Sequence, residues 1–251
     1  MDRKLIYSAG TTGASRYAAA CLHSLGLPVT DMPEKNVRYL LLDVPSFGPG
    51  GQLRDGGAVE KLLRQLPKDI LICGGNLRHP ALEEYETVDF LQDETYLCDN
   101  AYITAECALD TALPYLKCTI RHCPVLIIGW GRIGKCLARI LKNLEADVTV
   151  AARNPGDRAM LHGLGYGAVS VEELPLCLSH FRLLYNTVPC PVLNTAQMAL
   201  CREDCVKIEL ASKNGMEGDD IVIARGLPGL HMPESSGTLI ADTFIRLCYG
   251  R

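Results

Sequence analysis

The chain has 251 residues, of which 48% are hydrophobic and 22% are charged, a balance typical of folded globular proteins. This length predicts one large domain or two small ones, and the composition excludes wholesale disorder. The formal net charge of −4 gives no indication of the positive surface that binds nucleic acid or an anionic membrane. The sequence contains no run of 18 consecutive apolar residues, so it predicts no membrane span.

The beginning of the chain, Met1–Ile6, enters a strand-like segment directly and lacks the apolar core of a signal peptide. The 12 cysteines include no Cys-x-x-Cys pair, and most of them lie in apolar runs. These features predict a cytoplasmic protein whose reduced thiols act as small apolar side chains. The closest cysteine spacings lack the partners that zinc requires, so no metal site is predicted.

Three short apolar runs in the first part of the chain predict buried strands, at residues 4–8, 39–43 and 70–73. Helical patterns separate them, at residues 16–25 and 58–66. This alternation is typical of a parallel sheet that helices cover on both faces. A long helical pattern without strand signals follows from about Asp93 to Cys118.

The second part of the chain repeats the alternation. Strands are predicted at residues 125–128, 147–151, 183–185, 206–210 and 221–223, with a helix at 132–144 and a final helix at about 235–248. The predicted fold is therefore α/β, with two α/β lobes around a cleft, and the C-terminal lobe is a doubly wound Rossmann dinucleotide-binding domain. We expect an N-terminal lobe on the substrate side at 1–92, a helical connector at 93–120, the Rossmann domain at 121–233, and a C-terminal helix at 234–251 that packs back on the N-terminal lobe.

The sharpest motif is the glycine loop Gly129-Trp130-Gly131-Arg132-Ile133-Gly134. It directly follows a predicted strand and opens a predicted helix, which is the context that dinucleotide binding requires. The first glycine permits a tight turn, the second lets a pyrophosphate approach the backbone, and the third lets the helix pack on the strand. The pyrophosphate then meets the N–H groups at the start of the helix. A purely structural glycine turn is the alternative.

The end of the next predicted strand indicates which dinucleotide binds. NAD-binding domains usually place an acidic residue about 20 residues after the glycine loop, where it holds the ribose hydroxyl. This chain has Ala152-Arg153-Asn154 at the strand end. The guanidinium of Arg153 suits a 2′-phosphate, so NADP is favoured and NAD remains the alternative. A solvated surface arginine is the other interpretation.

Two further strand ends point to the same crevice, because ligands in such sheets lie beyond the carboxyl ends of the strands. One holds Asn186-Thr187-Val188-Pro189, which could line the cofactor, and the other holds Ala211-Ser212. Asn and Thr after a strand also serve as ordinary turn formers, so spacing alone leaves both interpretations open.

From about Leu91 to Leu247 the chain resembles the family of the A subunit of dipicolinate synthase from spore-forming bacteria. The resemblance rests on the order and spacing of several short segments: Asp99-Asn100, Thr104-Ala105-Glu106, the glycine loop, Ala152-Arg153, Asn186-Thr187-Val188-Pro189, Glu209-Leu210-Ala211-Ser212, Gly226-Leu227-Pro228-Gly229-Leu230, Pro233 and Ser236-Gly237-Thr238-Leu239-Ile240-Ala241.

The resemblance implies a two-lobed fold similar to that of the D-2-hydroxyacid dehydrogenases, with a nicotinamide dinucleotide bound in the cleft. It implies oxidation of a dihydrodipicolinate-type ring to dipicolinate during sporulation, with hydride passing to the nicotinamide. A smaller flavoprotein-like B subunit is the implied partner, and a homodimer is a weaker expectation.

A small dicarboxylate substrate needs local cations in a chain of net charge −4, and the candidates include Arg16, Lys213, Arg225 and His231. Aromatisation also requires loss of a proton. Since histidine has a suitable ordinary pKa, His231 is the candidate base, and Lys213 is the second candidate catalytic residue. Solvated surface side chains are the alternative for both.

Two other functions remain open. The chain could be an NADP-dependent dehydrogenase of another small acid, or a non-catalytic subunit that binds NADP as a scaffold or sensor.

Overall fold

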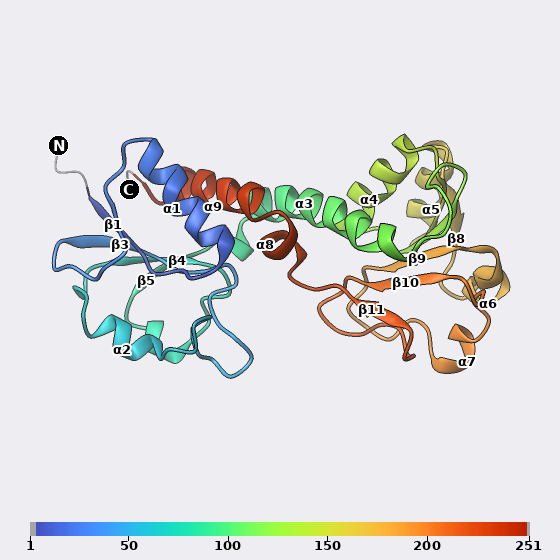
Figure 1. Cartoon of the computed structure of the whole chain (residues 1–251). Coiled ribbons are helices and arrows are strands. Elements are labelled where there is room, and N and C mark those ends of the chain that lie inside the picture. The colour runs from blue at the N-terminus through green and yellow to red at the C-terminus, as the bar shows by residue number, and fades with distance from the viewer. Residues whose placement is uncertain (1–3, 250–251) are drawn as a thin grey trace. The chain divides into compact units, whose positions relative to one another are not determined.

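The computed structural model describes residues 4–249 and divides into two compact units. Unit 1 comprises Met1–Ile103 and Pro228–Arg251, and unit 2 comprises Thr104–Leu227. Residues 1–3 and 250–251, which the predicted segments 1–92 and 234–251 include, lie outside the described residues. Each unit has its own parallel sheet (Figure 1).

Unit 1 is built on a five-stranded parallel sheet in the order β2-β1-β3-β4-β5. The strands are β1 (Leu5–Ser8), β2 (Val29–Thr30), β3 (Val37–Leu41), β4 (Leu71–Gly74) and β5 (Glu86–Asp89). The three predicted strands are confirmed, and the structure adds the two edge strands β2 and β5. Neither carries a buried apolar run: β2 has two half-buried residues, and β5 begins with two exposed ones.

Helices cover both faces of this sheet. On one face α1 (Gly13–Ser24) packs along α9 (Pro233–Leu247), and both helices contribute to the core beneath them. A Cβ atom added at Gly237 would lie 2.6 Å from the carbonyl oxygen of Ala14, so the glycine lets the two helices approach closely. The other face packs against α2 (Val59–Leu63) and the 3₁₀ turn Pro80–Leu82.

The helix α3 (Glu94–Ala112) occupies most of the segment in which a helical connector is predicted, and a 3₁₀ turn at Leu113–Tyr115 follows it. The division between the two units falls inside α3, between Ile103 and Thr104. A second 3₁₀ turn, Phe90–Gln92, leads into the helix from unit 1.

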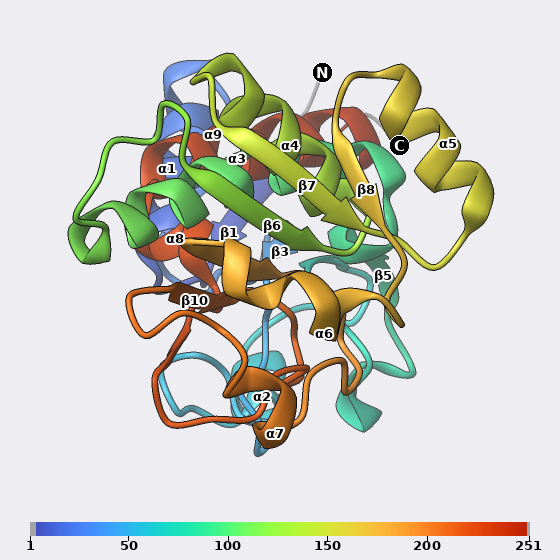
Figure 2. The ribbon, with the colours of Figure 1, turned by 90° about the vertical axis from the view of Figure 1, so that its right-hand side faces the viewer.

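Unit 2 is built on a six-stranded parallel sheet in the order β11-β10-β9-β6-β7-β8. The strands are β6 (Pro124–Ile128), β7 (Asp147–Ala151), β8 (Gly167–Val169), β9 (Leu183–Asn186), β10 (Val206–Glu209) and β11 (Ile221–Ile223). Figure 2 shows β6, β7 and β8 side by side. Numbered along unit 2, the order is 3-2-1-4-5-6, which is that of the dinucleotide-binding Rossmann fold. The predicted fold class is confirmed.

The helices of unit 2 include α4 (Arg132–Asn143) and α5 (Pro155–Gly163), which join the first three strands. Two short helices, α6 (Leu174–Cys177) and α7 (Thr195–Met198), and a 3₁₀ turn at Leu178–His180 lie in the later connections. The helix predicted at 132–144 is confirmed to within one residue.

The structure adds one short helix that the sequence patterns do not predict. The segment Gly226–Gly229, whose glycines and proline are typical of a turn, contributes to α8 (Leu227–His231). Proline fits the first turn of a helix, because its missing N–H would have no partner there. Pro228 is therefore compatible with α8, although the sequence Gly-Leu-Pro-Gly is more typical of a turn. Gly226 precedes the helix with φ of +65°.

No helix within residues 4–249 is long and apolar enough to cross a membrane. No disulfide joins the cysteines in this part of the chain.

The start of α3 supplies a stability test. Asp93 Oδ1 accepts a hydrogen bond of 2.8 Å from the N–H of Tyr96, and the two carboxylate oxygens accept bonds of 2.6 and 3.1 Å from the guanidinium of Arg246. The Arg246 hydrogen bond is the main cause that lowers the pKa of Asp93 below its ordinary value of 3.8. The pair therefore stabilises the fold above that pH, and this contribution is lost as the pH falls through the lowered value.

We expect Asp93→Asn to reduce the free energy of unfolding at pH 7 by about 0.5–1 kcal/mol, since Asn can still cap the helix but cannot pair with Arg246. Asp93→Ala removes the cap too and should cost about 1 kcal/mol more. Urea denaturation at pH 7 and at decreasing pH measures both, with Asp69→Asn in the exposed Arg38 pair as control. A deficit of Asp93→Asn that persists unchanged in acid would contradict this assignment.

Candidate functional site

The strand order of unit 2 reverses between β6 and β9, which are neighbours in the sheet but not consecutive in the chain. The loops after these two strands leave in opposite directions and open a crevice at their carboxyl ends, where ligands bind in open α/β sheets. A cavity of about 790 Å³ lies there, within the range of small-molecule and cofactor sites. It is lined by Ile128, Gly129, Trp130, Gly131, Ala151, Ala152, Arg153, Asn154, Asp157, Val171, Thr187, Val188, Pro189, Cys190, Pro191 and Val192.

Two glycines of the loop after β6 are required by the fold itself. Gly129 has φ of +107°, and a Cβ atom there would lie 2.4 Å from Thr187 Oγ1. Gly134 is buried in α4, where a Cβ atom would lie 2.2 Å from the carbonyl oxygen of Gly129. These positions make the turn and bring the helix onto the strand, which agrees with the roles expected for the first and third glycines.

Gly131 differs from its neighbours because a Cβ atom at this position would meet nothing within 4 Å. It is the N-cap of α4, and as a glycine it has no side chain with which to cap the helix. The first N–H groups of a helix lack partners within the helix and carry its partial positive charge. The protein alone does not require a glycine here, whereas a ligand that approaches the backbone does.

The loop after β7 places the predicted NADP residues at the cavity. Arg153 and Asn154 are exposed, while Ala152 is buried at the strand end. Arg158 Nη1 donates bonds of 2.7 Å to the carbonyl oxygens of Ala152 and Arg153, and Asn154 caps α5 by accepting from the N–H of Gly156 at 2.8 Å. The backbone that carries Arg153 is thus held from both sides.

Asp157 is a cavity residue that the sequence prediction missed. It lies in the first turn of α5, four residues after Arg153, rather than at the strand end where an acidic residue was sought. Helical spacing after the strand could have revealed it, because the first turn of α5 folds back toward the same loop.

Trp130 is the single tryptophan of the chain and lines the cavity. Its ring centroid lies 6.0 Å from that of Tyr166 in an edge arrangement, and Lys135 Nζ lies 5.8 Å from its ring. Burial is the main cause that raises the pKa of Tyr166 above its ordinary value of 10.0. These contacts hold the indole beside the glycine loop.

At the end of β9 and in the loop that follows it, some residues line the cavity and one is buried in the core. Thr187, Val188 and Pro189 line the cavity, and Thr187 Oγ1 donates a bond of 2.9 Å to the carbonyl oxygen of Ile128. Asn186, predicted as a cofactor residue, is fully buried, and its amide donates to both carboxylate oxygens of Glu209 at 2.8 and 3.0 Å.

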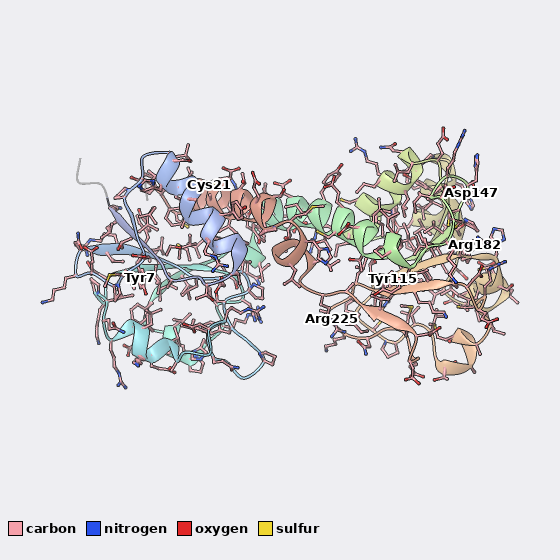
Figure 3. All side chains as sticks on the ribbon, viewed as in Figure 1. Tyr7, Cys21, Tyr115, Asp147, Arg182 and Arg225 are labelled. Carbon is pink, nitrogen blue, oxygen red and sulfur yellow. The ribbon has the colours of Figure 1, made fainter. Side chains whose placement is uncertain are left out.

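The remaining predicted residues lie elsewhere. Of the described residues that line the cavity, none is Arg132, Ile133, Gly134, Asn186, Ala211, Ser212, Lys213 or His231. Lys213 and Ser212 are exposed after β10, and His231 is exposed at the end of α8 in unit 1. Arg225, labelled beyond β11 in Figure 3, donates from Nε to the carbonyl oxygen of Ala211 at 2.9 Å and from Nη2 to Asn214 at 2.5 Å.

Unit 1 has its own strand reversal, between β1 and β3, but a carboxylate of the protein fills it. Asp43 is 4% exposed after β3, and its oxygens accept bonds from the N–H groups of Thr11 and Thr12 at 3.0 and 3.1 Å. The hydroxyls of Thr12 and Ser15 donate to it at 2.6 and 2.5 Å. The start of α1 therefore already holds the carboxylate of Asp43.

Within residues 4–249, no group of three His, Cys, Asp or Glu side chains is arranged to hold a metal ion.

No protein-family model matches the chain. A curated relative, the A subunit of dipicolinate synthase from Bacillus subtilis (strain 168), is 27% identical over 156 residues, which make up 59% of this chain and 52% of that protein. The match therefore spans about half the length of the curated relative. The crystal structure of the A subunit of dipicolinate synthase from Bacillus halodurans has a TM-score of 0.85 at 20% identity, and covers 98% of this chain and 97% of that one.

The chain resembles the A subunit of dipicolinate synthase. The resemblance stated from the sequence motifs is thereby confirmed. The fold is shared more widely: a transhydrogenase from Sinorhizobium meliloti has a TM-score of 0.76 at 12% identity, and covers 97% of this chain and 92% of that one. The chain thus shares its fold both with the dipicolinate synthase protein and with the transhydrogenase.

The glycine loop supplies a matched pair of substitutions. Gly134→Ala should reduce the free energy of unfolding by about 1–3 kcal/mol, because its Cβ would collide with backbone. Gly131→Ala should cost less than about 1 kcal/mol, since its Cβ enters open space. Thermal unfolding of the two variants measures the difference, and equal losses would contradict the distinction between the two glycines.

Proposed function

We propose that the chain is an NADP-linked oxidoreductase subunit that resembles the A subunit of dipicolinate synthase in activity as well as in fold. The observation that carries the proposal is the cavity at the strand reversal of unit 2, lined by Gly131 and Arg153. The sequence similarity to the dipicolinate synthase protein supports the choice of substrate class. A cytoplasmic location and a role in sporulation belong to the same proposal.

The residues of the cavity fit a dinucleotide. The start of α4 at Gly131 offers N–H groups and open space for a pyrophosphate. Arg153 offers a guanidinium for a 2′-phosphate at the end of β7. Thr187, Val188 and Pro189 would line the other mononucleotide, since the fold consists of two such halves.

Asp157 bears on the choice between the two cofactors. A carboxylate in this cavity could accept a hydrogen bond from the ribose hydroxyl of NAD, and it would repel the 2′-phosphate of NADP. The guanidinium of Arg153, which also lines the cavity and is more exposed than Asp157, opposes that repulsion. The proposal of NADP therefore requires that the attraction of Arg153 for the 2′-phosphate exceeds the repulsion by Asp157.

Arg153→Ala should weaken NADP binding about tenfold or more and leave NAD binding unchanged, because only NADP carries the phosphate. Trp130 lies in the cavity and is the single tryptophan, so its fluorescence reports both titrations. Arg121→Ala is the control, since Arg121 pairs with Glu145 before β6 and away from the cavity lining. Equal loss of NADP and NAD affinity in Arg153→Ala, or no binding of either to the wild type, would refute the cofactor assignment.

The proposed reaction converts a dihydrodipicolinate-type ring to dipicolinate. A nicotinamide dinucleotide held by the cavity residues would supply the acceptor for a hydride from the ring. Loss of that hydride together with loss of one proton to a base would make the ring aromatic. Lys213 and His231 are the proposed cation and base, and both are exposed side chains. A flavoprotein-like B subunit is the proposed partner.

Turnover is expected as an increase in NADPH absorbance with a dihydrodipicolinate-type substrate, measured with and without the B subunit. His231→Ala should reduce kcat about a hundredfold or more if His231 is the base, while His23→Ala at the exposed end of α1 should not. Unchanged turnover in His231→Ala would remove it from the mechanism. Turnover only with another small acid would favour a different dehydrogenase, and NADP binding without any turnover would favour a non-catalytic role.

A further inference from the structure

A buried carboxylate lies behind one wall of the cavity. Glu209 is the last residue of β10 and is 0% exposed. Its Oε1 accepts from Asn186 Nδ2 at 2.8 Å and from the N–H of Ala211 at 3.0 Å. Its Oε2 accepts from Asn186 Nδ2 at 3.0 Å and from the N–H groups of Gly215 and Met216 at 2.8 and 3.2 Å. Both oxygens accept and neither donates, which suits the ionised form.

These bonds fasten two loops to each other. Asn186 ends β9, and its amide also donates to the carbonyl oxygen of Val188 at 3.0 Å while its oxygen accepts from the N–H of Val188 at 3.0 Å. Gly215 comes from the loop after β10, and its carbonyl oxygen accepts from the N–H groups of Val192 and Leu193 at 2.7 and 3.1 Å. The segment 187–192 is therefore held at both of its ends by groups that Glu209 binds.

The contact between the loops leaves no spare room. A Cβ atom at Gly215 would lie 2.4 Å from Asn186 Nδ2 and 2.7 Å from the carbonyl oxygen of Cys190. Residues 187–192 all line the cavity, whereas Glu209 itself does not. Glu209 therefore acts on the cavity through the segment that its partners hold rather than by direct contact.

We propose that Glu209 is a positioning residue for the mononucleotide half of the cofactor that residues 187–192 would line. This inference rests on the proposed function, because it assigns a ligand to that wall of the cavity. The half of the cavity beside Arg153 belongs to β7 and α5, and different hydrogen bonds hold its backbone. Loss of the Glu209 carboxylate therefore affects the two halves unequally.

The unequal effect distinguishes positioning from a general structural role. Adenosine 2′,5′-bisphosphate carries only the 2′-phosphoadenosine half, whereas NADP carries both halves. A variant that merely loosens unit 2 weakens both ligands, whereas a variant that displaces residues 187–192 weakens NADP alone. Unchanged binding of adenosine 2′,5′-bisphosphate also shows that the variant is folded.

The experiment measures binding of both ligands by calorimetry in the full chain. Glu209→Gln replaces one accepting oxygen by an NH₂ group that faces N–H donors, and it should weaken NADP binding about tenfold or more. The affinity for adenosine 2′,5′-bisphosphate should stay within about twofold of the wild type. Glu209→Asp retains the charge on a shorter side chain and should recover part of the NADP affinity.

Glu217→Gln is the matched control, since Glu217 is an exposed carboxylate of the same unit that accepts from Thr195. Unchanged NADP affinity in Glu209→Gln, or equal weakening of NADP and the fragment, would overturn the positioning role while leaving the proposed function in place. If the wild type bound neither ligand, the proposed function would fail and the positioning role with it.

Discussion

The reversal of strand order between β6 and β9 is the constraint on which the candidate site depends. In a sheet whose strands all run parallel, every strand ends at the same edge, and loops to successive strands cover that edge. Only at the reversal do two neighbouring loops turn away from each other and leave the edge open. The glycine loop after β6 and the segment 187–192 after β9 are the two loops that diverge, and the cavity lies between them.

The two units show that a reversal of strand order does not by itself make a binding site, because side chains of the protein can occupy the start of the helix there. In unit 1 the carboxylate of Asp43 satisfies the N–H groups and hydroxyls at the start of α1. In unit 2 the N-cap of α4 is Gly131, which has no side chain to cap the helix, and the space at this position is open. The same element, a helix that begins after a buried parallel strand, is capped by a carboxylate of the protein in one unit and begins at a glycine beside open space in the other.

Sequence patterns predicted most of the fold because a buried strand, a turn and a helix are encoded in contiguous residues. The pattern missed β2, β5 and β8, since edge strands bury little apolar surface and carry no distinctive run. It also missed α8, where Gly226 and Pro228 suggest a turn although proline is compatible with the first turn of a helix. In the candidate site, the strand-end pattern does not include Asp157, which reaches the cavity from the first turn of α5.

The sequence by itself determined the two α/β halves, the glycine loop and the exposed arginine at the end of β7, because each depends on residues within one strand-turn-helix segment. Only the tertiary structure decided which polar side chains line the cavity and which form hydrogen bonds inside the core. Thr187 and Asn186 are adjacent and both form hydrogen bonds, yet Thr187 lines the cavity while Asn186 binds the buried Glu209, 23 residues away along the chain. The physical reason is that a buried carboxylate such as that of Glu209 needs hydrogen-bond donors. The order of the sheet decides which strand lies beside β10, and therefore which side chain supplies those donors.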